Sequence, residues 1–267
     1  MRAVLKYPGA KNRIADWIVS YIPQHTVYVE LFAGSLAVLF NKPRCHIETV
    51  NDLNGDVVNF FKVLRDKPEE LNRLIKLTPY SREEYDKSYQ ESKNDVERAR
   101  GFCVRCWQGF GCANLYHNGF KSGQQTKSPN PAKAWGELPC TMIQAAERLK
   151  GVQIENLPAL KILERYNTPD VFIYADPPYL HGTRKNYLYK HEMTDSEHEE
   201  LLKALLFHPG PVMISGYDND LYNEYLKGWR KVQRDTLAEN GLKRTETLWM
   251  NYSDVQMSFA DFPEVLP

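Results

Sequence analysis

The chain has 267 residues, with 34 Lys and Arg against 34 Asp and Glu, and 42% of its residues are hydrophobic. These values describe a globular protein with a continuous core and exclude disorder as the main state. The longest nearly apolar stretch, Leu31–Phe40, has about half of the ~20 residues that a membrane-spanning helix needs. The first residues also lack the apolar core of a signal peptide. We therefore expect a cytoplasmic protein, and the odd number of cysteines, five, agrees with reduced thiols.

Strand-like and helical patterns alternate along most of the chain, which predicts an α/β fold built on one sheet. Short apolar runs predict seven strands: Val27–Leu31, His46–Val50, Val152–Glu155, Val171–Ala175, Pro211–Ser215, Lys231–Leu237 and Thr247–Asn251. Apolar residues at helical spacing predict helices over Lys11–Tyr21, Asp56–Leu64, Pro68–Leu77, Arg82–Gln90, Val96–Trp107, Thr141–Leu149 and Leu157–Tyr166. The clearest helix start is the capping box of Thr194 and Glu197, which opens a helix that continues through Leu206.

The segment 65–149 interrupts this alternation, because it contains helices and a long loop but no convincing strand. We therefore predict one sheet domain made of residues 1–64 and 150–267, and an inserted, mainly helical domain over residues 65–149. The loop is predicted at Gly109–Pro139, which is rich in Gly, Asn, Ser and Pro. A loop of this length is more typical of a functional segment than of a simple connection.

The balanced net charge hides a basic segment within the predicted insert. Between Arg98 and Lys133, six residues are basic and none is Asp or Glu. Aromatic rings and amides accompany these cations, a mixture that suits contacts with the phosphates and bases of nucleic acid. The candidate DNA contacts in this segment are Arg105, Gln108, Asn118 and Lys121. A basic surface loop with aromatic residues in the core explains the same composition.

The tetrapeptide Asp176-Pro177-Pro178-Tyr179 directly follows the apolar run Val171–Ala175. A buried strand thus ends with a carboxylate, a rigid turn and an aromatic ring at the carboxyl edge of the sheet, where α/β proteins bind ligands. The Asp176 carboxylate and the Pro177 carbonyl can each accept a hydrogen bond from a planar amine. The Tyr179 ring can stack on the same ligand. A structural strand-to-loop turn is the alternative interpretation.

Asp176–Tyr179 resembles motif IV of the N6-adenine DNA methyltransferases, and other segments resemble this D12 class of DNA adenine methylases in the same order. The segments are, in chain order, Lys6–Lys11, Tyr28–Ser35 (motif I), Val50–Asn54 (motif II), Val152–Leu157, Asp176–Tyr179 and, towards the C-terminus, Arg244–Asn251. The last segment is similar to a strand of the phage and prophage-type members. The order of motifs corresponds to the alpha arrangement.

Five residues in or next to the segments that are expected to bind the cofactor depart from the family pattern. Tyr7 and Ala10 replace Trp and Gly in the opening Lys-Trp-x-Gly-Gly-Lys element, and Leu36 stands where motif I often has a second Gly. Asn156 and Leu157 replace the Asp-Phe or Asp-Tyr that many members have beside the adenine of their cofactor, S-adenosylmethionine.

The resemblance implies a seven-stranded, Rossmann-like sheet that binds S-adenosylmethionine (SAM), with the 65–149 insert as the target-recognition domain. It implies that the cofactor contacts Tyr7, Gly9, Lys11, Glu30, Phe32, Gly34, Ser35, Asp52, Asn156, Leu157 and Asp176. Asp52, at the end of its strand, can accept hydrogen bonds from ribose hydroxyls. The alternative role for Asp52 is a helix cap, which Asn54 or Asp56 could provide instead.

The resemblance also implies methyl transfer to N6 of an adenine that is flipped out of a DNA duplex, without a metal. Asp176, Pro177, Pro178 and Tyr179 are the expected catalytic residues. A basic loop follows them, in which Arg184, Lys185 and Tyr187 could hold the nucleotide or its phosphates, or could form a solvated surface.

The expected substrate is double-stranded DNA, and a separately encoded restriction endonuclease is a candidate partner. One alternative is a methyltransferase for another planar amine, such as cytosine N4 or an RNA base. Another is an inactive DNA-binding protein of the same fold, which the presence of Lys11, Asp52 and Asp176 disfavours.

Two clusters of metal-ligand residue types have simpler explanations. Cys103 and Cys106 lie within a helical pattern, and the spacing to Cys112, His117 and Cys140 matches no zinc template, so buried thiols are expected. The polar residues around Thr194, from His191 to His198, fit the helix start described above.

Overall fold

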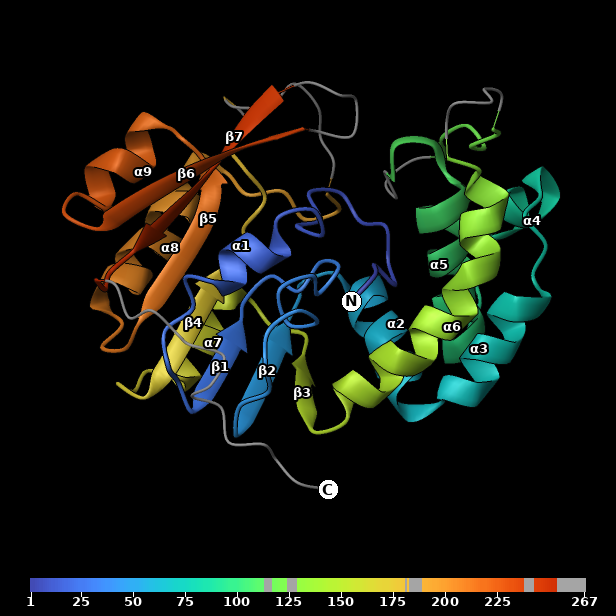
Figure 1. Ribbon diagram of the computed structural model, residues 1–267, viewed down its shortest axis with the longest axis horizontal. Coiled ribbons are helices and arrows are strands. Elements are labelled where there is room, and N and C mark those ends of the chain that lie inside the picture. The colour runs from blue at the N-terminus through green and yellow to red at the C-terminus, as the bar shows by residue number, and fades with distance from the viewer. Residues whose placement is uncertain (113–116, 124–128, 181, 183–188, 238–242, 254–267) are drawn as a thin grey trace.

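A computed structural model describes residues 1–112, 117–123, 129–180, 182, 189–237 and 243–253. At its centre lies a seven-stranded sheet in the order β3-β2-β1-β4-β5-β7-β6 (Figure 1). The strands are β1 (Val27–Glu30), β2 (Ile47–Asn51), β3 (Val152–Glu155), β4 (Val171–Ala175), β5 (Val212–Tyr217), β6 (Arg230–Leu237) and β7 (Lys243–Met250). Strands β1 to β5 are parallel, whereas β7 is antiparallel to both β5 and β6. All seven predicted strands are therefore confirmed, with the largest shift at the start of β7.

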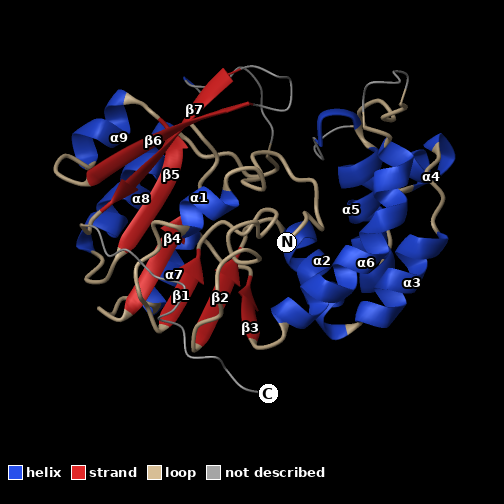
Figure 2. Cartoon of the chain, viewed as in Figure 1, coloured by secondary structure: helices blue, strands red, loops and turns tan. Residues whose placement is uncertain are grey.

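The helices fall into two groups (Figure 2). The sheet is accompanied by α1 (Ala15–Val19), α7 (Ala159–Arg165), α8 (Asp195–Phe207) and α9 (Asp220–Tyr225). Beside β3 lie α2 (Gly55–Asp66), α3 (Pro68–Leu77), α4 (Arg82–Lys87), α5 (Asp95–Gln108), the short 3-10 helix η1 (Phe110–Cys112) and α6 (Pro131–Leu149). We call the group α3 to α6, with η1, the helical lobe. The described part of residues 67–149 contains no strand.

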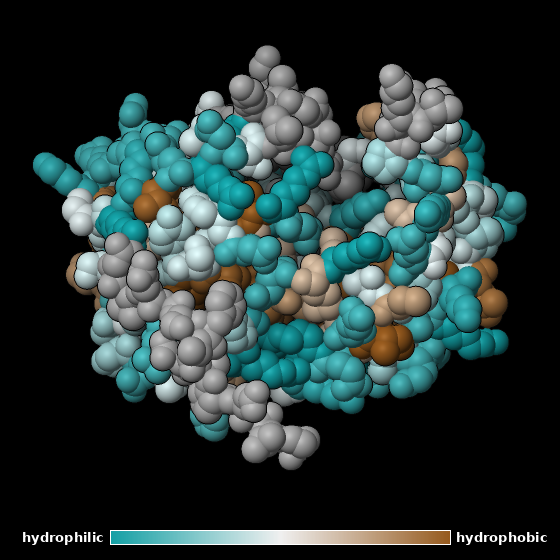
Figure 3. Space-filling model, viewed as in Figure 1, coloured by the Kyte–Doolittle hydropathy of each residue, from teal (hydrophilic) through white to brown (hydrophobic). Residues whose placement is uncertain are grey.

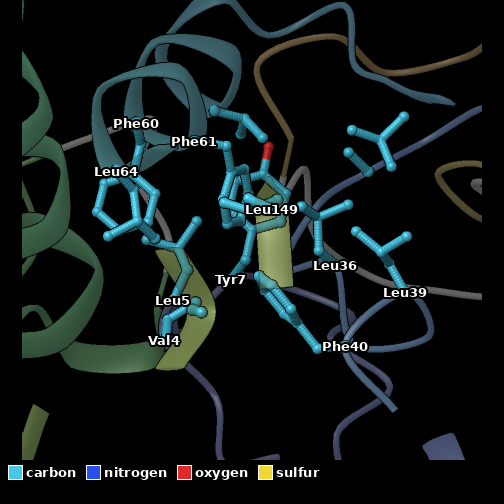
Figure 4. Packing of buried hydrophobic residues seen from close by; sticks show 14 of the residues in the cluster. Val4, Leu5, Tyr7, Leu36, Leu39, Phe40, Phe60, Phe61, Leu64 and Leu149 are labelled. Carbon is cyan, nitrogen blue, oxygen red and sulfur yellow. The ribbon is translucent and has the colours of Figure 1, made fainter. Parts of the chain in front are cut away.

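The sheet and the helical lobe share a core. One cluster of buried side chains covers a face of the sheet and continues into the lobe through α2. Figure 4 shows this cluster, with Tyr7 from the N-terminal segment, Leu36 from the turn after β1, Phe60 and Phe61 from α2, and Leu149 from the end of α6. A second cluster fills the opposite face of the sheet, against α7 and α8. Each fully buried large apolar side chain contributes about 1.5–3 kcal/mol, so this shared core holds the lobe against the sheet.

The predicted loop Gly109–Pro139 is wrong in its last part, because α6 already begins at Pro131. Asn130 caps this helix by accepting hydrogen bonds from the backbone N–H groups of residues 132 and 133. Pro139 suggested a loop because proline lacks an N–H and disfavours helix interiors. Here the buried Trp135 and Leu138 pack into the shared core on the same turn, and this packing outweighs the lost hydrogen bond.

Two smaller differences concern helix extent. The predicted helix Lys11–Tyr21 is shortened to α1, so Lys11 lies in the loop that precedes it. Helix α9, which Asn219 caps, was not predicted. The capping box at Thr194 is confirmed, with Thr194 and Glu197 each accepting from the other's backbone N–H.

The face shown in Figure 3 is mostly hydrophilic, and its hydrophobic residues form small, separate patches. None of the described helices combines the length and the apolar composition that a membrane-spanning helix requires.

Candidate active site

The carboxyl ends of β1, β2 and β4 bring the predicted motifs to one edge of the sheet. Glu30 ends β1 and lies opposite Val50 of β2 and Tyr174 of β4 in the strand register. Asp52 follows β2 and Asp176 follows β4, so three carboxyl groups from distant parts of the sequence meet at this edge. This arrangement results directly from the parallel strands, whose equivalent ends lie side by side.

The turn after β1 has the backbone geometry of a ligand-binding turn. Gly34 and Leu36 both have positive φ angles, 48° and 56°. The backbone N–H of Gly34 donates to Asp52 Oδ2 at 2.8 Å, which fixes the turn against the end of β2. Leu36 occupies a left-handed conformation that costs a non-glycine residue about 1–2 kcal/mol, and its complete burial offsets this cost. The position where the family often has Gly therefore keeps the conformation that favours Gly.

Asp52 is held by two backbone groups. Its Oδ1 accepts from the N–H of Asn54 at 2.8 Å, in addition to the bond from Gly34. Desolvation raises the pKa of Asp52 to about 6, although both backbone hydrogen bonds lower it. Asn54, not Asp52, caps α2 by accepting from the N–H of Asp56. Asp52 therefore does not cap the helix, which was the alternative role for this residue.

One pocket runs along this edge of the sheet. Ten of the eleven predicted cofactor-binding residues line it, namely Tyr7, Gly9, Lys11, Glu30, Phe32, Gly34, Ser35, Asp52, Leu157 and Asp176. The eleventh, Asn156, is exposed outside the lining and donates to the carbonyl oxygens of Asp52 and Leu53 at 2.7 and 3.2 Å. The lining also includes residues after the catalytic motif, namely Tyr189, His191, Glu192, Met193, Glu197, Glu200 and Leu201.

Two buried residues of the lining, Tyr7 and Glu30, are fixed by hydrogen bonds. Tyr7 accepts a hydrogen bond from the Asn54 side chain at 3.2 Å, and burial raises the pKa of its phenol. Glu30 accepts from the Tyr28 hydroxyl at 2.8 Å. Burial raises the pKa of Glu30 to about 8, so this carboxyl group is mostly protonated at neutral pH.

Asp176 is anchored through both of its carboxylate oxygens. Its Oδ2 accepts from Lys11 Nζ at 2.7 Å, and its Oδ1 accepts from Ser215 Oγ at 2.9 Å. The second contact follows from the strand register, because Ala175 of β4 lies opposite Ile214 of β5 and the next residues are Asp176 and Ser215. Each carboxylate oxygen has a further lone pair, so Asp176 can still accept hydrogen bonds from a ligand.

Lys11 contributes a buried positive charge to the site. Its side chain is only 7% exposed, and its Nζ also donates to the Gly9 carbonyl at 2.9 Å. Burial lowers the pKa of Lys11, but the carboxylates of Asp176 and Glu246 raise it above its ordinary value. Lys11 therefore stays protonated beside the Asp176 carboxyl group.

Tyr179 connects this group to β7. Its hydroxyl donates to Glu246 Oε1, and its ring packs edge-on against Tyr217 with centroids 4.6 Å apart. Lys11 Nζ lies 4.9 Å from the centre of the Tyr179 ring and 3.8 Å from the same Glu246 oxygen. Lys11, Asp176, Tyr179 and Glu246 thus form one contiguous cluster, which we call the Asp176 cluster.

Sequence reasoning missed Ser215, Tyr217 and Glu246. Ser215 follows the apolar residues of β5, and Glu246 is a buried acid within a strand, 4% exposed. A polar residue in a buried strand was the signal that could have marked each of them. Their proximity to Asp176 depends on how β4, β5 and β7 pair, which no local pattern reveals.

The predicted DNA contacts of the insert are only partly at the surface. Gln108 is completely buried, and its side-chain amide donates to the Pro79 carbonyl at 3.2 Å, so it cannot reach DNA in this conformation. Arg105 is half-buried, and its guanidinium donates to the Ser88 carbonyl and lies 5.4 Å from the centre of the Tyr89 ring. Arg105 and Gln108 lie in the last turn of α5, on the side of this helix that packs against the rest of the lobe.

Asn118 and Lys121 are half-buried residues of the segment that follows η1. Their carbonyl oxygens accept from the hydroxyls of Tyr85 and Tyr80, both at 2.6 Å. The other three predicted contacts, Arg184, Lys185 and Tyr187, lie outside the described residues.

The cysteine cluster has no metal-site geometry in the part of the chain that is described. Cys103 and Cys106 are buried on α5, and Cys140 is exposed on α6. Among the described residues, no group of three His, Cys, Asp or Glu side chains could hold a metal ion.

The mixed seven-stranded sheet, with a pocket across the ends of its parallel strands, is the fold of an α/β methyltransferase. Residues 7–240 match the model of the D12 class N6 adenine-specific DNA methyltransferases, and the chain belongs to this family. It is accordingly an enzyme that methylates adenine in DNA and uses a methyl donor.

Three relatives are similar over much of the chain. The Type II methyltransferase M.MjaIII of Methanocaldococcus jannaschii is 25% identical, over 94% of this chain and 99% of its own length. The Type II methyltransferase M1.LlaDCHI of Lactococcus lactis subsp. cremoris is also 25% identical, over 95% and 96%. The DNA N-6-adenine-methyltransferase of Escherichia phage P1 is 26% identical over 67% of this chain, but over only 24% of its own length.

Proposed function

We propose that the methyl donor is SAM and that it binds in the pocket at the carboxyl ends of β1, β2 and β4. The charge of the lining supports this, because six carboxyl groups line the pocket, the mostly protonated Glu30 among them, against a single lysine, Lys11, among the lining residues that the structure describes. SAM carries a positive sulfonium and a positive ammonium group, and a wall of carboxyl groups favours such a ligand. When bound, SAM would supply an activated methyl group. The turn at Gly34 allows the ligand to approach the backbone, and Asp52 retains lone pairs for ribose hydroxyls.

The acceptor in this proposal is N6 of an adenine that has left the duplex. An amine conjugated with a purine ring is a weak nucleophile, so its orientation and the charge near it decide the rate. Asp176 and the Pro177 carbonyl would accept the two N6 hydrogens, while Pro178 keeps the turn rigid and the Tyr179 ring stacks on the base. The carboxylate is held still by Lys11 and Ser215, which is the single observation that supports this role most strongly. Proton loss from N6 accompanies or follows methyl transfer, because a carboxylate cannot deprotonate a neutral amine beforehand.

The helical lobe, together with the rest of segment 65–149, would recognise the DNA sequence, and residues 1–64 and 150–267 would bind the cofactor and the flipped base. Double-stranded DNA is the proposed form of the substrate. Asn118, Lys121 and the loop with Arg184, Lys185 and Tyr187 are the proposed direct contacts, whereas Arg105 and Gln108 would shape the lobe from within. The names of the two Type II relatives support a place in a restriction-modification system beside a separate endonuclease, in the cytoplasm of a bacterial or phage-infected cell.

The direct test is to incubate the protein with methyl-labelled SAM and unmethylated DNA and to identify the labelled nucleoside. We expect the label in N6-methyladenine. The variant Asp176→Ala should abolish it, and the matched variant Asp170→Ala, at an exposed position just before β4, should not. A label in N4-methylcytosine or only in RNA would contradict the proposed acceptor. An absence of label with every DNA tested would contradict the proposal as a whole.

A further inference from the structure

Glu246 is a buried carboxyl group outside the cofactor pocket. It lies in β7, opposite Tyr217 of β5 in the strand register, and is 4% exposed. A buried carboxylate costs several kcal/mol unless charge and hydrogen bonds compensate it. Such a group in a strand of the sheet requires an explanation, and its two neighbours provide one.

Two different donors converge on one oxygen of this side chain. The hydroxyl of Tyr179 donates to Glu246 Oε1, and the ammonium of Lys11 lies 3.8 Å from the same atom. Tyr179 carries the ring that would stack on the base, and Lys11 holds Asp176 Oδ2 at 2.7 Å. Glu246 is therefore connected to both parts of the proposed adenine site without lining the pocket itself.

We propose that Glu246 is a positioning residue for methyl transfer, whose carboxylate fixes the Tyr179 ring against the flipped base and the Lys11 ammonium against Asp176. This inference rests on the proposed function. Glu246 also contributes charge, because the Asp176 cluster contains one cation and two carboxylates when Glu246 is ionised. The attacking amine gains positive charge in the transition state, and a net negative cluster stabilises it.

An amide at this position would serve only one of the two donors. The oxygen of a Gln side chain could still accept from the Tyr179 hydroxyl, but it would not attract the Lys11 ammonium as a charge does. The ring would keep its place while the Lys11 and Asp176 pair lost its second carboxylate. Because Gln keeps the size of the Glu246 side chain but not its charge, this replacement tests the electrostatic role of Glu246 separately from its packing.

The ionisation of Glu246 gives this inference a pH signature. Burial raises the pKa of Glu246 to about 7, although Lys11 and the Tyr179 hydroxyl lower it. The groups that face it are Lys11 from the N-terminal segment, Asp176 and Tyr179 after β4, Tyr174 in β4, Tyr217 in β5 and Arg234, opposite it in β6. Because the ionised form is the active one, the rate of methyl transfer should rise with pH through about 7.

The experiment measures single-turnover methyl transfer to DNA on both sides of pH 7 for the wild type, two variants of the cluster and one control variant. Glu246→Gln should lower the rate about 10- to 100-fold above pH 7, because Lys11 and Asp176 would be less well positioned. The rise of the rate with pH should disappear, because Gln does not ionise. Tyr179→Phe removes the hydrogen bond that lowers the Glu246 pKa, so the rise should move to higher pH. Glu224→Gln, the same change at an exposed position of α9, should match the wild type. The affinity for SAM, measured by calorimetry, should stay within about threefold in Glu246→Gln and in Tyr179→Phe, because neither Glu246 nor Tyr179 lines the pocket.

A wild-type rate and pH profile for Glu246→Gln would overturn the inference while leaving the proposed function intact. A rate loss matched by an equal loss of SAM affinity and of thermal stability would also overturn it, since this indicates a structural role alone. Should Glu246→Gln fail to fold, Tyr179→Phe decides the matter, because an unshifted pH profile in that variant contradicts the inference. If the wild type methylates no DNA, the proposed function fails and this inference fails with it.

Discussion

The Asp176 cluster and the helical lobe contain ion pairs of similar length in very different surroundings. Lys11 and Asp176 approach to 2.7 Å with side chains that are 7% and 18% exposed. Lys67 and Asp95, at the start of the lobe, approach to 2.9 Å but are 44% and 47% exposed. Water and salt screen the second pair, whereas the first acts in a medium of low dielectric constant. The distance between the charged atoms therefore does not determine the strength of an ion pair. Burial makes the interaction of Lys11 with Asp176 the stronger one, and this pair can contribute to catalysis.

The largest expected effect of a substitution in the Asp176 cluster comes from Asp176→Asn. The Asn side chain has an NH2 group in place of one carboxylate oxygen. This donor cannot accept the hydrogen bond from Lys11 or from Ser215, and it cannot accept a hydrogen bond from N6 of the adenine. We expect kcat for DNA methylation to fall by at least ~100-fold. The affinity for SAM should change much less, because many other residues line the pocket. Equal losses in both quantities would contradict the assignment of Asp176 to the reacting amine.

Lys11→Met should have the next largest effect, and it acts on stability as well as on activity. The substitution leaves two carboxylates, Asp176 and Glu246, without their shared cation. Removal of one partner from a buried ion pair costs about 3–5 kcal/mol. Urea unfolding of the variant should show this loss in the free energy of unfolding. A stability equal to that of the wild type would mean that the cluster tolerates unpaired charge and is more hydrated than its burial indicates.

Ser215→Ala removes a single hydrogen bond from Asp176 Oδ1. A hydrogen bond to a charged group contributes about 1.5–3 kcal/mol, and part of this appears in the rate because the carboxylate plane becomes less fixed. We expect kcat to fall on the order of tenfold, with little change in KM for DNA. Ser196→Ala, at an exposed position in the first turn of α8, is the matched control. An unchanged kcat in Ser215→Ala would show that Lys11 alone orients Asp176.

Lys67→Met is the counterpart of Lys11→Met in the helical lobe and should have the smallest effect. Because both partners of the Lys67 and Asp95 pair are exposed, its loss should leave the urea midpoint and the methylation rate unchanged within error. Comparison of the two Met variants, under the same salt conditions, sharpens the contrast between the regions. A large loss of stability from Lys67→Met would contradict the view that the exposed ion pair contributes less to stability than the buried one.

The sheet and its motifs could be predicted because their signals are local. Continuous apolar runs mark buried parallel strands, and Asp176 is the first residue after such a run. The resemblance to a methyltransferase family then related Lys11 and Asp52 to the same edge. Local signals also predicted the capping box at Thr194 and gave Asn54 as one of two candidates for the cap of α2.

What could not be predicted depends on tertiary contacts. Ser215 and Glu246 reach Asp176 only because β5 pairs with β4 on one side and β7 on the other. The start of α6 was hidden by Pro139, whose unfavourable backbone is outweighed by the packing of its helix. Gln108 looked like a surface amide in a basic segment, but the end of α5 turns it inward.

A crystal structure of the protein with a DNA duplex and a non-reactive SAM analogue would test the proposed role of Asp176 directly. We expect one adenine outside the duplex, with N6 within hydrogen-bonding distance of Asp176 and the Pro177 carbonyl, and with the Lys11 and Ser215 contacts to Asp176 retained. We also expect the analogue to contact Gly34 and Asp52. A flipped base bound elsewhere, or an Asp176 carboxylate turned away from N6, would contradict this role.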